Sequence, residues 1–266
     1  MKHYCEKILT VQILISICLS FHITKSTAQN VPQDFGVETS SRSSATKSLP
    51  NLRILPLGDS ITQGFGSSSG NGYRAQLQDM LNYSSPSVTY IGSQKSGNMS
   101  NNVHEGYPGA VIDEIASQGL PLLAQKPNLI LVMAGTNDIS RAHNVDDAPK
   151  RLGALVDLII QNSPLSTIIV AELLPILNPP ESEESGKLFN AKIPEILALR
   201  QKAGNKVLLV KMSSGFSKTD LEDGLHPNDK GYKRIADTWY SGIQQVNDLG
   251  WLQEPISVDQ KKGQPK

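Results

Sequence analysis

Two short segments of the chain carry side chains that together could perform nucleophilic hydrolysis. Gly58-Asp59-Ser60 follows the first apolar run, and Asp223 precedes His226 by three residues. A serine hydroxyl attacks a carbonyl only if a base removes its proton, and an imidazole does so best when a carboxylate holds its other ring nitrogen. The Asp-x-x-His spacing allows one loop to deliver both base and acid. The pattern indicates Ser60, His226 and Asp223 as a candidate catalytic set for ester hydrolysis.

Each of these residues also has an ordinary structural interpretation. Ser60 could be a turn serine or a helix N-cap, and His226 could simply begin a helix beside a solvated aspartate. A rival nucleophile is Ser68, because residues 66–70 read Gly-Ser-Ser-Ser-Gly and match the Gly-x-Ser-x-Gly elbow. That elbow requires a strained turn directly between a strand and a helix, whereas Ser68 lies inside a Ser/Gly-rich stretch. We therefore rank Ser60 above Ser68.

The remaining histidines and aspartates show no comparable pairing. Beyond an N-terminal segment discussed below, the histidines are His104, His143 and His226, and only His226 has an acid three residues earlier. We expect structural roles in turns for a set of acids, namely Asp59, Asp138 and Asp146. No metal-ligand spacing is present, so we predict no metal site.

Ester hydrolysis also needs hydrogen-bond donors where negative charge develops on the tetrahedral intermediate. Asn137, in Gly135-Thr136-Asn137-Asp138, can offer its side-chain amide, and the backbone amide of Ser60 can supply a second donor. The backbone amide of Gly106 is a third candidate, in a loop after the second strand. Gly109 in the same loop is its rival. The predicted oxyanion hole is therefore Ser60, Gly106 and Asn137.

Short apolar runs alternate with longer amphipathic segments, which is typical of a parallel sheet covered by helices on both faces. The predicted strands are Leu52–Leu57, Val88–Ile91, Leu129–Ala134, Ile168–Leu173 and Val207–Val210. The predicted helices are Arg74–Leu81, Ile112–Leu123, Asp147–Gln161, Phe189–Ala203 and Asn228 to about Val246. Because ligands bind beyond the carboxyl ends of parallel strands, we expect the polar motifs to converge at one edge of the sheet.

The N-terminus resembles a secretory signal, with Lys2 and Lys7, an apolar stretch, and a small-residue cleavage site at Ser26-Thr27-Ala28. Polar residues interrupt the apolar stretch, which argues against stable membrane insertion. The segment holds three basic residues, one acidic residue and both cysteines, so its removal changes the net charge from zero to −2. We predict a secreted protein without disulfides or a nucleic-acid partner. Two sequons, at Asn82 and Asn98, are candidate glycosylation sites.

The rest of the chain divides simply. Residues 1–28 are the predicted signal peptide, and residues 29–50 a Ser/Thr-rich lead-in that cannot form a core. Residues 51–252 form one catalytic domain, and residues 253–266 a flexible tail. We find no internal repeat and expect a monomer.

Taken together, the motifs resemble the SGNH, or GDSL-type, hydrolase superfamily over about residues 52–247. Its four blocks correspond to Gly58-Asp59-Ser60, the Glu105-Gly106 segment, residues 135–138, and the pair Asp223 and His226. The resemblance implies a flavodoxin-like three-layer α/β/α fold with a five-stranded parallel sheet and no cofactor. It also implies that Ser60 is the nucleophile and that Ser60, Gly106 and Asn137 are oxyanion donors.

A finer resemblance is to the acetylxylan esterases of carbohydrate esterase family three. It rests on Leu-Pro-Leu-Gly-Asp-Ser-Ile-Thr-Gln-Gly at 55–64, His-Glu-Gly-Tyr-Pro-Gly at 104–109 and Asp-Gly-Leu-His-Pro at 223–227. The family implies removal of acetyl groups from acetylated xylan-type polysaccharide, or from small esters, through an acyl-enzyme on Ser60. One alternative is a lipase or lysophospholipase on the same triad. The other is a catalytically silent carbohydrate-binding protein.

Overall fold

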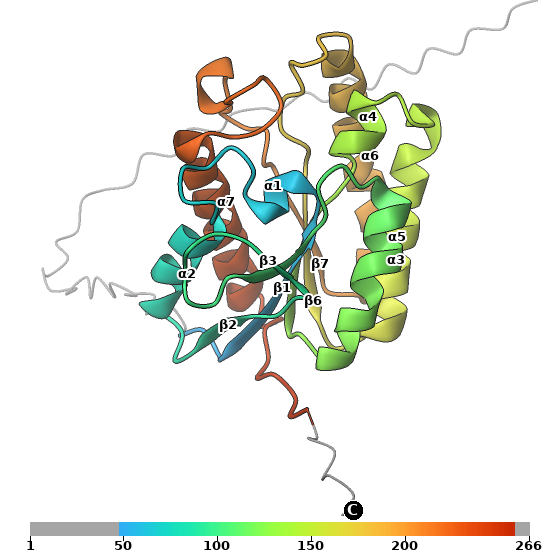
Figure 1. Ribbon diagram of the computed structural model, residues 1–266. Helices are drawn as coiled ribbons and strands as arrows, with labels where there is room; N and C mark the ends of the chain where they lie inside the picture. Colours follow the sequence, from blue (N-terminus) through green and yellow to red (C-terminus); the bar gives the residue numbers. More distant parts are fainter. Residues whose placement is uncertain (1–47, 259–266) are drawn as a thin grey trace, which may run out of the picture. The chain divides into compact units, whose positions relative to one another are not determined.

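The computed structural model describes residues 48–258, and these form a single sheet with helices on both faces (Figure 1). The strands lie in the order β3-β4-β1-β5-β6-β7. β2 pairs with the amino-terminal half of β1, whereas β4 pairs with its carboxyl end. Five of them are the predicted strands, and all pair in parallel: β1 (Leu52–Gly58), β2 (Val88–Tyr90), β5 (Leu129–Met133), β6 (Thr167–Ala171) and β7 (Val207–Val210). The predicted α/β fold with a parallel sheet is therefore confirmed.

Two short strands extend the sheet beyond the predicted five. β4 (Val103–Gly106) pairs in parallel with the end of β1, and β3 (Gln94–Lys95) pairs antiparallel with β4. The segment that contains Gly106 was predicted to be a loop. It is a strand because its backbone completes the ladder beside β1, a long-range pairing that a four-residue run of mixed polarity does not reveal.

Helices cover the sheet in two layers, visible on opposite sides of the strands in Figure 1. α2 (Arg74–Asn82) and α7 (Asp229–Asp248) pack together on one face. The other face carries α3 (Ile112–Gly119), α5 (Ala148–Asn162) and α6 (Ser182–Lys202). Shorter turns of helix are α1 (Ser60–Gln63), α4 (Thr136–Ser140), η1 (Leu120–Gln125), η2 (Val145–Asp147) and η3 (Lys218–Asp220).

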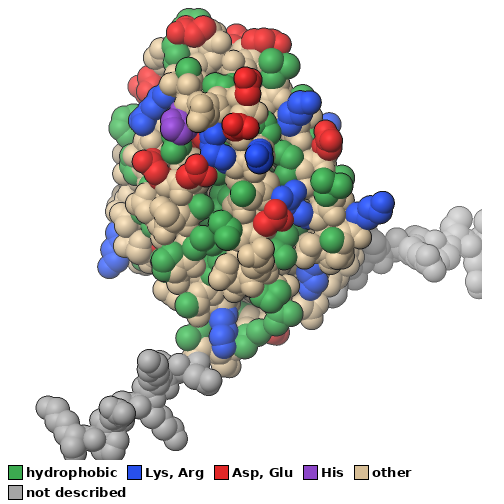
Figure 2. Space-filling view, turned by 90° about the vertical axis from the view of Figure 1, so that its right-hand side faces the viewer, with side chains coloured by type: hydrophobic (Ala, Val, Ile, Leu, Met, Phe, Trp, Pro, Cys, Tyr) green, Lys and Arg blue, Asp and Glu red, His purple; other side chains and the backbone are tan. Residues whose placement is uncertain are grey.

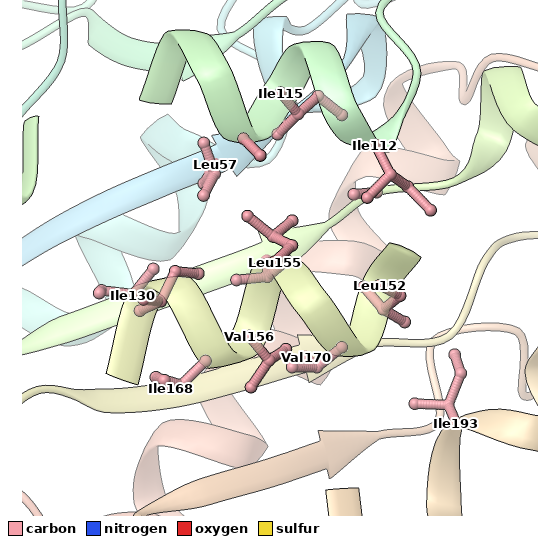
Figure 3. Close-up of a cluster of buried hydrophobic side chains, with 14 of the residues drawn as sticks. Leu57, Ile112, Ile115, Ile130, Leu152, Leu155, Val156, Ile168, Val170 and Ile193 are labelled. Carbon is pink, nitrogen blue, oxygen red and sulfur yellow. The ribbon is translucent and has the colours of Figure 1, made fainter. Parts of the chain in front are cut away.

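The core lies between each helical layer and the sheet because the strands are apolar on both faces. All five residues of β5 and of β6 are buried. On one side, Leu152, Leu155 and Val156 of α5 belong to the same hydrophobic cluster as Ile130 and Ile168 of the sheet (Figure 3). These helical positions recur at the three- and four-residue spacing of one helix face. Because parallel strands must be covered on both sides, the double layer follows from the sequence of the strands.

Two predicted helices differ at their ends. α6 begins at Ser182, seven residues before the predicted start at Phe189, because its first turns are acidic rather than apolar and Glu183 and Glu184 suit the positive end of the helix dipole. The segment predicted as one helix over residues 112–123 is divided, since α3 ends at Gly119 and continues as the 3₁₀ turn η1. Pro121 at the start of that turn lacks an amide proton and favours the change.

The domain extends beyond both predicted boundaries. Leu49, assigned to the lead-in, is 2% exposed and packs in the core. At the other end, Asn128 donates to the carbonyl of Gln253 and Arg53 donates to that of Ile256. The tail carbonyls accept from side chains at the amino ends of β5 and β1, and the Leu49 amide donates to the Ser84 carbonyl after α2. The predicted signal peptide and most of the lead-in and tail fall outside the described residues.

The surface shows no concentration of one charge on the face seen in Figure 2, where acidic and basic side chains are interspersed. Within residues 48–258, no helix is both long and apolar enough to cross a membrane.

Candidate active site

Three polar segments meet because they leave neighbouring strands at paired positions. Gly58, the last residue of β1, pairs with Gly106 of β4 on one side and with Met133 of β5 on the other. Ser60 follows Gly58 by two residues, and Asn137 follows Met133 by four. The predicted convergence at the carboxyl edge of the sheet is therefore observed for these segments.

Ser60 is the first residue of α1, immediately after β1. The N-cap of this short helix is Asp59, whose Oδ1 accepts from the Ile61 amide at 2.9 Å. Ser60 is thus not the capping residue, and its hydroxyl is available for another partner. Its exposed fraction is 7%, so the residue is buried at the carboxyl edge of the sheet.

That partner is His226, which lies 166 residues later in the chain. Ser60 Oγ and His226 Nε2 are 2.9 Å apart, and His226 Nδ1 is 2.8 Å from Asp223 Oδ2. Asp223 Oδ1 also accepts from the backbone amides of His226 and Leu225, at 2.8 and 3.0 Å. One carboxylate therefore holds both the ring and the backbone of the histidine. The three residues form a continuous hydrogen-bonded chain of the kind that activates a serine.

Burial and hydrogen bonds move the pKa values of Asp223 and Asp59 in opposite directions. Partial burial opposes ionisation of Asp223, but the hydrogen bonds from His226 outweigh it and hold its pKa below the ordinary value. Asp59 is completely buried, and burial raises its pKa to about 6 against the opposing hydrogen bond from the Ile61 amide. The aspartate beside the serine is thus a capping residue, whereas the one beside the histidine supplies charge.

Asn137 lies in α4, next to β1, and is 5% exposed. Its Nδ2 donates to the carbonyl of Ala110 at 3.0 Å. A side-chain amide has two protons, so this bond orients the group and leaves the second proton. The neighbouring Asp138 is buried against Arg151 at 2.6 Å and accepts from the Ile112 amide, which is the structural role predicted for it.

Gly106 lies where β4 passes α1, and no side chain would fit there. A Cβ at this position would be 2.5 Å from the Gln63 nitrogen and 2.9 Å from the Asp59 carbonyl oxygen. Its amide donates to His104 Nδ1 at 3.0 Å. The predicted third oxyanion donor is therefore engaged by a histidine that was not predicted to take part.

His104 belongs to a buried polar network that reaches back to α1. Its Nε2 is 2.9 Å from Ser96 Oγ, and Ser96 Oγ in turn donates to the carbonyl of Gln63. Arg74 Nη2 donates to the same Ser96 oxygen at 2.8 Å. Burial, with a smaller contribution from Arg74, lowers the pKa of His104 to about 3. His104 is therefore neutral at physiological pH, with Nδ1 as an acceptor. The contacts of Ser96 with Arg74 and Gln63 join residues far apart in the chain, so they have no signal in the sequence.

The weaker candidates lie elsewhere. Ser68 is exposed in a turn, and its amide donates to Asp229 Oδ1 at 2.9 Å. The carbonyl of Gly109 accepts from Arg141 in the turn after β4. Asp146 is exposed in the 3₁₀ turn η2. The two sequon asparagines, Asn82 and Asn98, are both exposed.

The geometry agrees with what comparison with known proteins shows. The sequence pattern of the GDSL-like Lipase/Acylhydrolase family matches residues 57–234. The chain belongs to this family. The match spans the serine segment, the asparagine segment and the Asp-x-x-His pair, so this member is a carboxylic ester hydrolase. Within residues 48–258, no group of three or more His, Cys, Asp or Glu side chains gathers in a way that could hold a metal ion.

Relatives of this GDSL-family member include carbohydrate esterases. A solved Clostridium thermocellum family 3 carbohydrate esterase is 34% identical, with a TM-score of 0.67, and the alignment covers 75% of this chain and 98% of that one. A carbohydrate esterase family 3 structure from Talaromyces cellulolyticus is 23% identical with a TM-score of 0.63, over 74% of this chain and 99% of that one, and shares the fold. A multidomain esterase of Ruminococcus flavefaciens is 29% identical over 73% of this chain, which spans 28% of that protein's length.

Proposed function

We propose that this GDSL-family esterase is a serine acetylesterase that removes acetyl groups from xylan-type polysaccharide. The observation that carries the proposal is the hydrogen-bonded chain from Ser60 Oγ through His226 to Asp223. A serine with no such base would be unreactive at neutral pH. The relationship to the Clostridium thermocellum family 3 carbohydrate esterase supports a carbohydrate ester as the substrate.

The reaction proceeds in two steps, acetylation of Ser60 and hydrolysis of the acetyl-serine. His226 Nε2 takes the Ser60 proton as Oγ attacks the acetyl carbon, and the tetrahedral intermediate collapses when the same proton passes to the departing sugar oxygen. An acetyl group remains on Ser60. Water then attacks the acetyl-serine with His226 again as the base, releasing acetate and restoring the hydroxyl. Asp223 compensates the charge on the imidazolium in both halves.

The oxyanion is stabilised by the free amide proton of Asn137 and by the backbone amide of Ser60. We assign the Gly106 amide as the third donor, and a substrate oxygen would compete with His104 Nδ1 for its proton. Loss of one such donor typically lowers kcat by about 10²–10³.

Acetate release from acetylated xylan tests the substrate, run beside p-nitrophenyl acetate and a long-chain p-nitrophenyl ester. We expect turnover of both acetyl substrates, with kcat/KM on the long-chain ester lower by at least roughly tenfold if the enzyme is an acetylesterase. Preferential hydrolysis of the long-chain ester would instead favour a lipase. Turnover of p-nitrophenyl acetate without release from xylan would keep the esterase and exclude the proposed polysaccharide.

We also propose that the enzyme is secreted. The basic start, interrupted apolar stretch and Ser26-Thr27-Ala28 at the N-terminus support this proposal. Protein recovered from the medium of a producing culture should begin at Gln29, and intact Met1 in a cell-bound protein would contradict it.

A further inference from the structure

The aromatic side chain of Phe65, beside His226, is about half exposed to solvent. The Phe65 ring lies 4.5 Å from the His226 ring, centroid to centroid, with the planes tilted by 51°. Its exposed fraction is 54%, whereas Tyr73, Tyr232 and Trp239 are buried. Single exposed apolar residues are common on protein surfaces, so the position beside His226, rather than the exposure alone, is informative.

The backbone of Phe65 is fixed from both sides. Its amide donates to the Ser60 carbonyl at 3.0 Å, and its carbonyl accepts from the buried Tyr232 hydroxyl at 2.6 Å. The next residue, Gly66, has a φ of +88°, and a Cβ there would lie 2.6 Å from the Pro227 carbonyl oxygen. The loop therefore packs directly against the segment that carries His226. Phe65 is presented on a fixed peptide, which lowers the entropic cost of using its ring as a binding surface.

The proton transfer from His226 indicates whether the alcohol or the acyl part of the ester lies beside the Phe65 ring. His226 Nε2 must return the proton to the leaving oxygen, so the alcohol of the ester lies on the His226 side of Ser60. The acyl oxygen lies on the opposite side, toward Asn137. Phe65 contacts His226 and follows α1, so it borders the alcohol and not the acetyl group.

We propose that Phe65 is a specificity-determining residue that packs its exposed face against the ring of the leaving alcohol. The face of an aromatic ring is electron-rich and apolar, and it complements the C–H face of a pyranose or another saturated six-membered ring. The inference deepens the proposed function by assigning its leaving-group subsite. It rests on Ser60 and His226 acting as described.

Three acetate esters that differ only in the alcohol test the assignment: ethyl acetate, cyclohexyl acetate and acetylated xylooligosaccharide. In Phe65→Ala, we expect kcat/KM to fall roughly tenfold on the two ring-bearing esters, mainly through KM, since an aromatic contact of this kind is worth about one factor of ten. On ethyl acetate we expect a change below about twofold. Phe65→Tyr should behave as the wild type. Phe65→Leu, which keeps apolar bulk against His226 but removes the flat face, should show the same selective loss.

The matched control is Tyr83→Ala, which removes another exposed aromatic side chain, 93% accessible. Tyr83 follows α2 and lies near the start of β1, at the end of the sheet opposite Ser60. It should leave all three activities unchanged. Equal losses of kcat on all three esters in Phe65→Ala, with a shifted pH profile, would overturn the proposal, because Phe65 would then act through His226. Unchanged activity on all three, or wild-type behaviour of Phe65→Leu, would overturn it as well.

The proposed function can fail separately. If the wild type hydrolyses ethyl and cyclohexyl acetate but not the oligosaccharide, the carbohydrate substrate is wrong, and the ethyl and cyclohexyl pair still decides the role of Phe65.

Discussion

Asp223 makes two different kinds of hydrogen bond with the same histidine. Oδ2 holds the imidazole, while Oδ1 caps the backbone amides of His226 and Leu225. The Asp-x-x-His spacing was readable in the sequence because this turn needs only local geometry. The contact between His226 and Ser60 could be predicted only from the order of the strands. The partnership of Gly106 with His104 could not be predicted, because the segment gave no strand signal.

Replacement of Asp223 separates these two functions. Asparagine can still accept from both backbone amides through Oδ1, so we expect Asp223→Asn to keep the wild-type melting temperature. Its side-chain NH₂ faces Nδ1 and favours the wrong tautomer, so kcat should fall by about 10²–10⁴. Asp223→Ala should lose both activity and some thermal stability. Steady-state kinetics with thermal melts measure this, and near-normal kcat in Asp223→Asn would remove Asp223 from the mechanism.

At the scale of elements, the loop that carries the catalytic pair is tied to α7 by a second aspartate. Asp220, at the end of η3, has a fully buried side chain that is 3.0 Å from Lys230 Nζ and 3.2 Å from Arg234 Nε. It also accepts from the amide and hydroxyl of Ser217. Short elements such as η3 and β4 escape sequence reading because long-range contacts stabilise them. Long helices such as α5 are predictable because their own apolar period is sufficient.

The tie predicts a pH-dependent stability. Burial alone would raise the pKa of Asp220, but the Lys230 and Ser217 contacts outweigh it and hold the pKa well below the ordinary value. The unfolded chain therefore binds this proton first as the pH falls, so the stabilisation is complete above about pH 5 and is lost progressively below about pH 4, as the pH falls toward the folded-state pKa. Asp220→Ala should lower the free energy of unfolding by about 2 kcal/mol at pH 7.

The measurement compares the effect of Asp220→Ala on the free energy of unfolding at two pH values. Urea unfolding at pH 7 and pH 3 should show a smaller difference between the wild type and Asp220→Ala at the lower pH. Asp220→Asn, which can still accept from Ser217, should lie between them. An equal difference at both pH values would show that the charge of Asp220 contributes nothing.

At the scale of the whole molecule, the parallel sheet explains why residues from four distant segments form one site. The fold class was predictable because Leu129–Met133 and Thr167–Ala171 are continuous apolar runs that need cover on both faces. The domain ends were less predictable, since Leu49 and Ile256 are held by contacts with the amino ends of the strands. Family membership and the 34% identical carbohydrate esterase agree with this fold.

The most direct test of the account is acetyl-ester hydrolysis by Ser60→Ala beside Ser68→Ala, followed by peptide mapping of the wild type after reaction with a serine-directed fluorophosphonate. We predict that Ser60→Ala loses activity by roughly 10⁴–10⁶ while remaining folded, that Ser68→Ala retains it, and that the label lies on Ser60. A Ser60→Ala enzyme that keeps its activity, or a label on Ser68, would contradict the proposed mechanism.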